Sequence, residues 1–292
     1  MKLRRFDTSK IKVRSSGSGR RGRIPGGRGG GIGIGTLIIV AIAYFVFGAD
    51  PMQTLGTVQE AQEDSSGPQQ RSQVSEEQVC LRGPYATEAC NALQSLNETW
   101  EPEFRRAGIR FEQPVLDLFT GGRVTTEGCG SASSAAGPFY CPADMGIYID
   151  TGFYDQLAQM AGTGGDFARL YVIAHEYGHH IQNLTGLAAQ VRSAQQQNPR
   201  RSNELQVRME LQADCYAGVW AGKNRNLIER GDLDEGMRAA SSIGDDTLQR
   251  NAGQRINPEG FTHGTSAQRT EALRAGLESA DDSVCDRYFQ FN

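Results

Sequence analysis

The chain has 292 residues, enough for one domain of ordinary size with additional segments. Its formal net charge of −4 is unevenly distributed: residues 1–30 carry ten Lys or Arg side chains and one acid, which leaves 20 basic and 33 acidic residues, a net −13, in the remainder. A basic arm before an acidic body argues against a single nucleic-acid-binding protein and favours two environments.

The basic arm is expected to be disordered and cytoplasmic. Residues 13–30 are rich in Gly, Ser and Arg, a composition that cannot bury a core. They contain no aromatic residue on which a base could stack, so we predict no nucleic-acid partner.

Residues 31–48, "GIGIGTLIIVAIAYFVFG", contain no charge and no proline. As a helix they would extend roughly 27 Å, enough to cross a bilayer core. We predict a transmembrane signal anchor here; the alternatives are a cleaved signal peptide and a buried core helix. The positive charges before this run place the N-terminus in the cytoplasm and the following domain in the periplasm or cell exterior.

Residues 49–78 are polar and rich in Gln, Ser and Glu, so they predict a flexible linker to a folded domain at 79–292. All six cysteines follow the predicted anchor, and in an oxidising compartment they allow fifteen pairings. Cys80–Cys90 and Cys129–Cys141 would each close a short loop, which leaves Cys215–Cys285. Free buried thiols are the alternative.

The domain begins with a predicted helix at 90–108, followed by strands at 114–119 and 123–126 and a Gly/Ser/Ala loop at 127–137. Residues 145–150, "MGIYID", predict another strand, either an edge strand that pairs with an extended peptide or a buried strand. A helix at 151–162 and mostly helical segments beyond it indicate an α+β domain.

The segment "GGDFARLYVIAHEYGHHIQNLTG" reads as one helix, with Asp166 as its N-cap and Gly186 at its end. His175, Glu176 and His179 form the pattern H-E-x-x-H within it. Two histidines four positions apart lie on one helical face and can bind one zinc ion, with the glutamate beside it as general base. The alternative is a solvated polar face.

A third ligand is expected from the next helix, residues 201–223. Glu210 and Asp214 lie four residues apart on one face, with Glu210 as the predicted ligand and Asp214 as the acceptor that orients a histidine. Glu204 is the rival ligand, and an ordinary pair of solvated acids is the alternative. No third histidine follows at the spacing H-E-x-x-H-x-x-G-x-x-H. His180 points off the shared face and is expected to support the site or the fold.

The chain resembles the bacterial, membrane-anchored neutral zinc metallopeptidases over nearly its whole length. The similarity lies in the basic start with "RRF", the Gly/Ile-rich run, "GPFYCPAD" before "IYID", "HEYGHHIQ", "RMELQADCYAG" and "FTHGTSAQR". It implies a zincin-like domain of the gluzincin type, with Zn²⁺ on His175, His179 and Glu210, a catalytic Glu176 and Asp214 behind the site.

His263, in the loop "THGTS", is a candidate catalytic donor to the oxyanion of the reaction. Alternatively this loop serves only to cap the last helix, 267–280, through Thr265 or Ser266. Tyr140, Tyr171 and Tyr177 are further candidate donors.

These residues predict a membrane-anchored zinc metallopeptidase that acts on peptide or protein substrates through a water activated by zinc and Glu176. A catalytically weak or inactive zinc-binding adaptor of the cell envelope is the first alternative. A tethered interaction protein without metal is the second.

Overall fold

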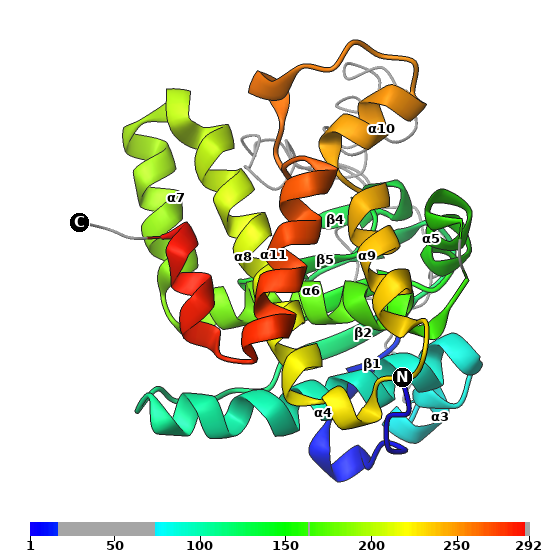
Figure 1. Ribbon diagram of the computed structural model, residues 1–292. Coiled ribbons are helices and arrows are strands. Elements are labelled where there is room, and N and C mark those ends of the chain that lie inside the picture. The colour runs from blue at the N-terminus through cyan, green and yellow to red at the C-terminus, as the bar shows by residue number, and fades with distance from the viewer. Residues whose placement is uncertain (17–73, 163, 290–292) are drawn as a thin grey trace, which may run out of the picture.

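The computed structural model describes residues 1–16, 74–162 and 164–289, and the fold is mostly helical with a small sheet, as predicted. In Figure 1, α8, α9 and α11 lie in front of the sheet, and α3 and α4 lie near its lower edge. The α-helices of the described residues are α3 (Glu76–Cys80), α4 (Pro84–Arg106), α5 (Phe153–Ala161), α6 (Asp166–Leu184), α7 (Leu187–Gln197), α8 (Ser202–Lys223), α9 (Asp232–Ser242), α10 (Asp245–Asn251) and α11 (Ser266–Ser279). Their strands are β1 (Lys12–Arg14), β2 (Val115–Phe119), β3 (Arg123–Thr125), β4 (Ser131–Ser133), β5 (Phe139–Cys141) and β6 (Gly146–Asp150).

The main sheet has the strand order β1-β2-β6-β5. Strands β1, β2 and β6 are parallel, and β5 runs antiparallel to β6. Because β6 pairs on both sides and is buried throughout, the hypothesis that "MGIYID" is an edge strand is wrong and the buried-strand alternative is correct. Its continuous apolar run is typical of a central strand. The predicted loop at 127–137 contains β4, which pairs with β3 in a separate two-stranded sheet.

Helix α6, which carries H-E-x-x-H, lies between the sheet and a second layer of helices. It contacts β5 and β6 on one side and α8 and α9 on the other. Its N-cap is Gly165, so the prediction that Asp166 caps the helix is wrong. The carboxylate of Asp166 instead accepts two hydrogen bonds from the amino group of Met1, at 3.1 and 3.0 Å. Gly186 follows the end of the helix at φ 78°, as its position in the sequence predicts.

Residues 1–16 pack on the domain, so the prediction of a disordered arm over residues 1–30 is wrong for this part of it. Phe6, Ile11 and Val13 are buried in the main core, and β1 forms a parallel pair with β2. Figure 1 shows this segment beside α3 and α4. The prediction missed these three apolar residues because the segment as a whole is rich in basic residues. Pairing of β1 with β2 stabilises the strand. The remainder of the arm lies outside the described residues.

An ion pair between Arg14 and a buried carboxylate holds β1 in place. The Nε atom of Arg14 donates to the fully buried carboxylate of Asp117 on β2 at 2.7 Å. Ser16 adds a backbone bond of 2.9 Å and a hydroxyl bond of 2.7 Å to the same carboxylate. Asp117 therefore has its charge and hydrogen bonds satisfied by residues of the N-terminal segment.

Helices α8 and α11 lie side by side (Figure 1) because glycines allow their backbones to approach. A Cβ atom on Gly218 would lie 2.1 Å from the carbonyl oxygen of Leu273, and one on Gly276 would lie 2.0 Å from that of Cys215. Neither position can accept a side chain without separating the helices. The close packing brings the start of α11 against the middle of α8.

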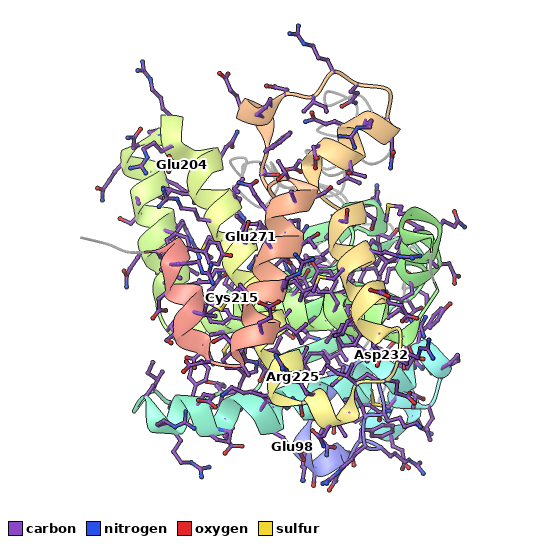
Figure 2. All side chains as sticks on the ribbon, in the orientation of Figure 1. Glu98, Glu204, Cys215, Arg225, Asp232 and Glu271 are labelled. Carbon is purple, nitrogen blue, oxygen red and sulfur yellow. A yellow bond between two sulfur atoms is a disulfide. The ribbon has the colours of Figure 1, made fainter. Side chains whose placement is uncertain are left out.

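Three disulfides join Cys80 to Cys90, Cys129 to Cys141 and Cys215 to Cys285, which confirms the predicted pairings. The third bond links α8 to the segment that follows α11, across a sequence separation of 70. In Figure 2, Cys215 lies midway along α8, beside α11.

No helix of residues 1–16, 74–162 and 164–289 has the length and apolar character needed to cross a membrane. The predicted anchor at 31–48 and most of the predicted linker at 49–78 lie outside these ranges. The last residues of that linker are helical, since α3 begins at Glu76.

Candidate metal centre

Helices α6 and α8 carry the residues for which the sequence predicts a metal site. They cross where Gly178 of α6 meets Ala213 of α8. A Cβ atom on Gly178 would lie 2.7 Å from the Cα atom and 2.9 Å from the carbonyl oxygen of Ala213. A glycine is therefore required at this position for the two backbones to approach so closely. The crossing places residues 175–179 opposite residues 210–214.

His175, His179 and Glu210 are brought together by this crossing. One ligand atom from each lies within 4.8 Å of the other two. The Oε2 atom of Glu210 is 3.1 Å from Nε2 of His175 and 3.5 Å from Nε2 of His179. His175 and Glu210 are buried.

The spacing of these atoms fits zinc. Bonds of roughly 2.0–2.1 Å from a tetrahedral zinc ion to nitrogen or oxygen place neighbouring ligand atoms about 3.4 Å apart. The two measured separations lie close to this value. Two imidazoles and one carboxylate also match the ligand types that zinc accepts in catalytic sites.

Each of the three side chains has a partner that orients it. Nδ1 of His175 is 2.8 Å from Asp214, and Nδ1 of His179 is 2.9 Å from Oε1 of Gln182. Gln206 donates to the second oxygen of Glu210 at 2.8 Å. With Nδ1–H donated to these acceptors, the Nε2 atoms of both histidines face the shared space, as metal-binding histidines require.

Asp214 has more partners than the sequence indicated. It is fully buried, and its Oδ1 atom accepts a hydrogen bond of 2.6 Å from the hydroxyl of Tyr171. Arg269 of α11 donates to both carboxylate oxygens, at 2.8 and 3.0 Å. The sequence gives no sign of a role for Arg269, because nothing local to "SAQRT" indicates that it contacts α8.

The carboxylates of Asp214 and Glu210 and the neighbouring histidines shift one another's pKa values. Burial lowers the pKa of His175, but the charge and hydrogen bond of Asp214 and the bond to Glu210 outweigh it and raise the pKa to about 10. Burial raises the pKa of Glu210, yet the nearby charge of His179 and the hydrogen bonds of both histidines take it well below its usual value. The negative charge of the two carboxylates thus favours a positive charge between α6 and α8.

Glu176 is buried beside both histidines. Burial raises the pKa of its carboxyl group, and the charges of His175 and His179 oppose this shift. A glutamate with a raised pKa in a water-poor site is suited to accept a proton and to release it again.

His263 lies within electrostatic range of Glu210, since each charge shifts the pKa of the other group. Its Nδ1 atom is 3.0 Å from the Thr262 hydroxyl and 3.3 Å from Oδ1 of Asp245. The other oxygen of Asp245 accepts the backbone N–H groups of Thr262, His263 and Gly264 at 2.8, 2.7 and 3.0 Å. Asp245, which the sequence did not identify, therefore fixes both the loop and the imidazole.

The three tyrosines considered as oxyanion donors bond to other groups. Tyr171 donates to Asp214, as described, and Tyr177 donates to Asn97 at 2.9 Å. The hydroxyl of Tyr140 is 3.0 Å from Nδ1 of His180. The opposite nitrogen of His180 donates to the carbonyl oxygen of Glu112 at 2.7 Å, so Nδ1 accepts the tyrosine proton. His263 is the remaining candidate among those predicted.

Thr265 caps α11 through a capping box with Gln268, as the capping interpretation of this loop predicts. The cap and the placement of His263 therefore coexist. Glu204 is not part of the group: it bonds to Arg201 and Arg208 and lies at the outer end of α8 (Figure 2).

A second group of acids, Asp166, Asp232 and Glu235, also has converging oxygens. The amino group of Met1 lies there, 3.0 Å from Asp166 and 2.8 Å from Asp232. Figure 2 labels Asp232 at the start of α9, and Figure 1 marks the N-terminus of the chain in the same region. We interpret this group as a structural ion cluster.

Comparison with known proteins places the chain in a family. The family model described as "Putative neutral zinc metallopeptidase" matches residues 2–288. The chain is 39% identical over 296 residues to the uncharacterized protein YpfJ of Escherichia coli K12, which covers 98% of this chain and 96% of YpfJ. It is 40% identical over 207 residues to the uncharacterized protein Rv2575 of Mycobacterium tuberculosis H37Rv, which covers 66% of this chain and 67% of Rv2575.

No solved structure matches the chain. The family match extends over both helices of the site, the loop of His263 and the N-terminal segment that completes the sheet. On this match and the identity to YpfJ, the chain belongs to the neutral zinc metallopeptidase family.

Proposed function

We propose that the protein is a zinc-dependent peptidase in which His175, His179 and Glu210 bind the metal and Glu176 is the general base. The observation that carries this proposal is the convergence of two Nε2 atoms and one carboxylate oxygen at separations that fit zinc. A structural zinc site has four protein ligands, whereas the group found among the described residues has three, as catalytic sites do.

Zinc bound here would supply a Lewis acid that lowers the pKa of a water molecule and polarises the substrate carbonyl. Glu176 accepts a proton from the attacking water and returns it to the leaving amine, a role that its raised pKa supports. His263, held by Asp245, donates a hydrogen bond to the oxyanion that forms. The zincin-like fold that the family resemblance implies is part of this proposal.

The substrate is proposed to bind in extended form along β5. This strand ends the main sheet of the described residues and runs antiparallel to its neighbour. Through Tyr140 and His180, it is also bonded directly to the helix of the site. A peptide that adds to a sheet edge gains main-chain hydrogen bonds, so β5 replaces β6 as the candidate for this role.

The domain is proposed to act outside the cytoplasm. All six cysteines of the chain form disulfides, which persist in oxidising compartments. Attachment to a membrane through residues 31–48 remains a proposal that rests on the apolar sequence alone.

The test compares the wild type with Glu176→Gln in the full chain, because residues 1–16 complete the sheet. Glutamine keeps the shape of the side chain but cannot accept the proton. We expect one zinc per chain in both proteins, and cleavage of a fluorogenic peptide library that falls at least about 100-fold in the variant. Zinc content is measured by elemental analysis, and chelation should abolish cleavage by the wild type.

Glu278→Gln, at an exposed position of α11, is the matched control and should cleave like the wild type. Zinc in both proteins with no cleavage in either would favour the adaptor alternative. Absence of zinc from the wild type would refute the metal site itself.

A further inference from the structure

Arg269 is a buried cation next to a proposed metal site. Its side chain is 2% exposed and lies at the end of the first turn of α11, a helix that contributes no proposed metal ligand. Buried arginines are rare unless they are paired, so its partners define its role.

The guanidinium of Arg269 makes a bidentate contact with the carboxylate of Asp214. Nε donates to Oδ2 at 2.8 Å and Nη2 donates to Oδ1 at 3.0 Å, a geometry that fixes the plane of the carboxylate. Nη2 also donates to the Tyr171 hydroxyl at 3.2 Å, and Nη1 to the carbonyl oxygen of Ile243 at 3.3 Å. Arg269 is thus held by three elements of the fold.

Asp214 transmits this constraint to His175. The Oδ1 atom that receives Nη2 also accepts Nδ1–H of His175 at 2.8 Å. Nη2 of Arg269 lies 3.4 Å from the same Nδ1 atom, and two donors at this distance cannot bond to each other. The proton of Nδ1 is therefore directed to the carboxylate, and Nε2 faces the space shared with Glu210.

His175 and His179 differ in the charge of the group that accepts the Nδ1–H. The partner of His179 is the neutral amide of Gln182, which is held in turn by Gln212 and the backbone of Met209. Only His175 has a carboxylate behind it, and a carboxylate buried there alone would be unstable. The positive charge that stabilises it comes from Arg269.

We propose that Arg269 is a positioning residue of the metal site, which acts through Asp214 to hold His175 in the tautomer and orientation that bind the metal. This inference rests on the proposed function, since it assumes that His175 is a ligand. It predicts that zinc affinity depends on Arg269, although no atom of Arg269 is proposed to contact the metal.

The packing of α8 on α11 makes this arrangement possible. The contact between Gly276 and Cys215, together with the disulfide Cys215–Cys285, holds α11 against the part of α8 that carries Asp214. Arg269 and Asp214 are 55 residues apart in the sequence and meet only through this packing.

The experiment measures zinc affinity of the full chain by chelator competition for Arg269→Gln and for Arg274→Gln. Arg274 lies on the same helix but is exposed, so its variant should match the wild type. We expect Arg269→Gln to bind zinc about 10- to 100-fold more weakly, the usual effect of losing an orienting partner. The visible spectrum of the cobalt-substituted protein should also change for Arg269→Gln alone, since it reports ligand geometry.

Arg269→Gln is then combined with Asp214→Asn in a double variant. If Arg269 acts through Asp214, Arg269→Gln has no further effect on zinc affinity there. The proposal is overturned if the affinity and the cobalt spectrum of Arg269→Gln match the control while only its thermal stability falls. An equal loss of affinity in both backgrounds also overturns it.

If Arg269→Gln fails to fold, Arg269→Lys replaces it in both backgrounds. Lysine keeps the charge but cannot make the bidentate contact, so we expect a smaller loss of zinc affinity. This loss should again disappear when Asp214→Asn is also present. A wild type that binds no zinc would refute the proposed function instead. If the wild type binds zinc but cleaves no peptide, the proposed peptidase activity fails, and the zinc-affinity measurements still test the role of Arg269.

Discussion

His180 is adjacent to a proposed ligand, yet its bonds show that it is structural. It is fully buried, accepts the proton of Tyr140 at Nδ1 and donates from Nε2 to the carbonyl oxygen of Glu112. It thereby joins α6 to β5 and to the segment before β2. The bond from Tyr140 requires the neutral imidazole, because a protonated Nδ1 cannot accept, and burial lowers the pKa of His180 to about 4.

This residue makes stability depend on pH. In the unfolded chain a histidine takes up its proton near pH 6.5, whereas His180 in the folded protein does so only near pH 4. Its contribution is therefore complete above pH 6.5 and is lost as the pH falls from 6.5 towards 4. Between pH 7 and pH 4.5 we expect it to reduce the free energy of unfolding by about 2 to 3 kcal/mol.

Urea unfolding of the wild type and of His180→Asn at both pH values isolates this contribution. Other titrating groups are common to both proteins, so they cancel in the difference. The free energy of unfolding of His180→Asn, taken relative to the wild type, should be about 2 to 3 kcal/mol larger at pH 4.5 than at pH 7. A relative stability that is the same at both pH values would contradict the assignment.

At the scale of elements, the metal site depends on how closely α6 approaches α8. Gly178 lies inside a helix, where glycine costs about 1 kcal/mol relative to alanine. This local cost is offset by a backbone contact with Ala213 that no larger residue permits. The distance between the ligands on the two helices follows from this contact.

We expect Gly178→Ala to destabilise the protein by about 1 to 3 kcal/mol, because the added methyl group must displace one helix from the other. Zinc affinity should fall with it, since Glu210 moves with α8. Helix propensity alone predicts the opposite sign, a gain in stability. Thermal unfolding and chelator competition therefore decide between the two effects, and a stabilised variant with unchanged affinity would exclude the steric argument.

Strand β1 is a second element whose position affects the rest of the fold. It forms one edge of the main sheet, and Arg14 neutralises Asp117. Removing residues 1–16 would take away the cationic partner of this carboxylate, the strand paired with β2 and the buried apolar side chains of the segment. A fragment that begins at residue 79 would therefore lack part of the fold.

At the scale of the whole molecule, the packing of residues 1–16 bears on membrane topology. These residues and the domain form one body, so in one chain they lie on the same side of any membrane. A single crossing between them would place them on opposite sides. The predicted cytoplasmic N-terminus and an extracytoplasmic domain therefore cannot both hold while β1 is paired with β2.

We expect cysteines introduced at Ser9 and Ser279, both exposed, to report the same side. Each is placed alone in the full chain and tested in cells with a maleimide that cannot cross the inner membrane. Because the disulfides favour the outside, both should be labelled. Labelling of Ser279→Cys without Ser9→Cys would support a single crossing and show that β1 does not pair with β2 of the same chain.

Features that depend on residues close in the chain were predictable from the sequence. The H-E-x-x-H pattern, the paired acids of α8 and the approximate extents of α6 and α8 follow from helical periodicity, which relates residues three or four apart. Two of the disulfides close short loops, and the third follows once they are paired. The family and the proposed reaction also rest on these local patterns.

Tertiary structure alone decided which distant residues meet. Arg269 reaches Asp214, Asp245 holds His263, Arg14 neutralises Asp117, and β6 becomes central only because β2 and β5 pair on either side of it. No spacing in the sequence encodes these contacts, since they arise from the packing of separate elements. The sequence by itself determined the chemistry of the proposed site, and the fold determined which charges, backbone contacts and strand edges surround it, because burial and long-range pairing set the energies of those groups.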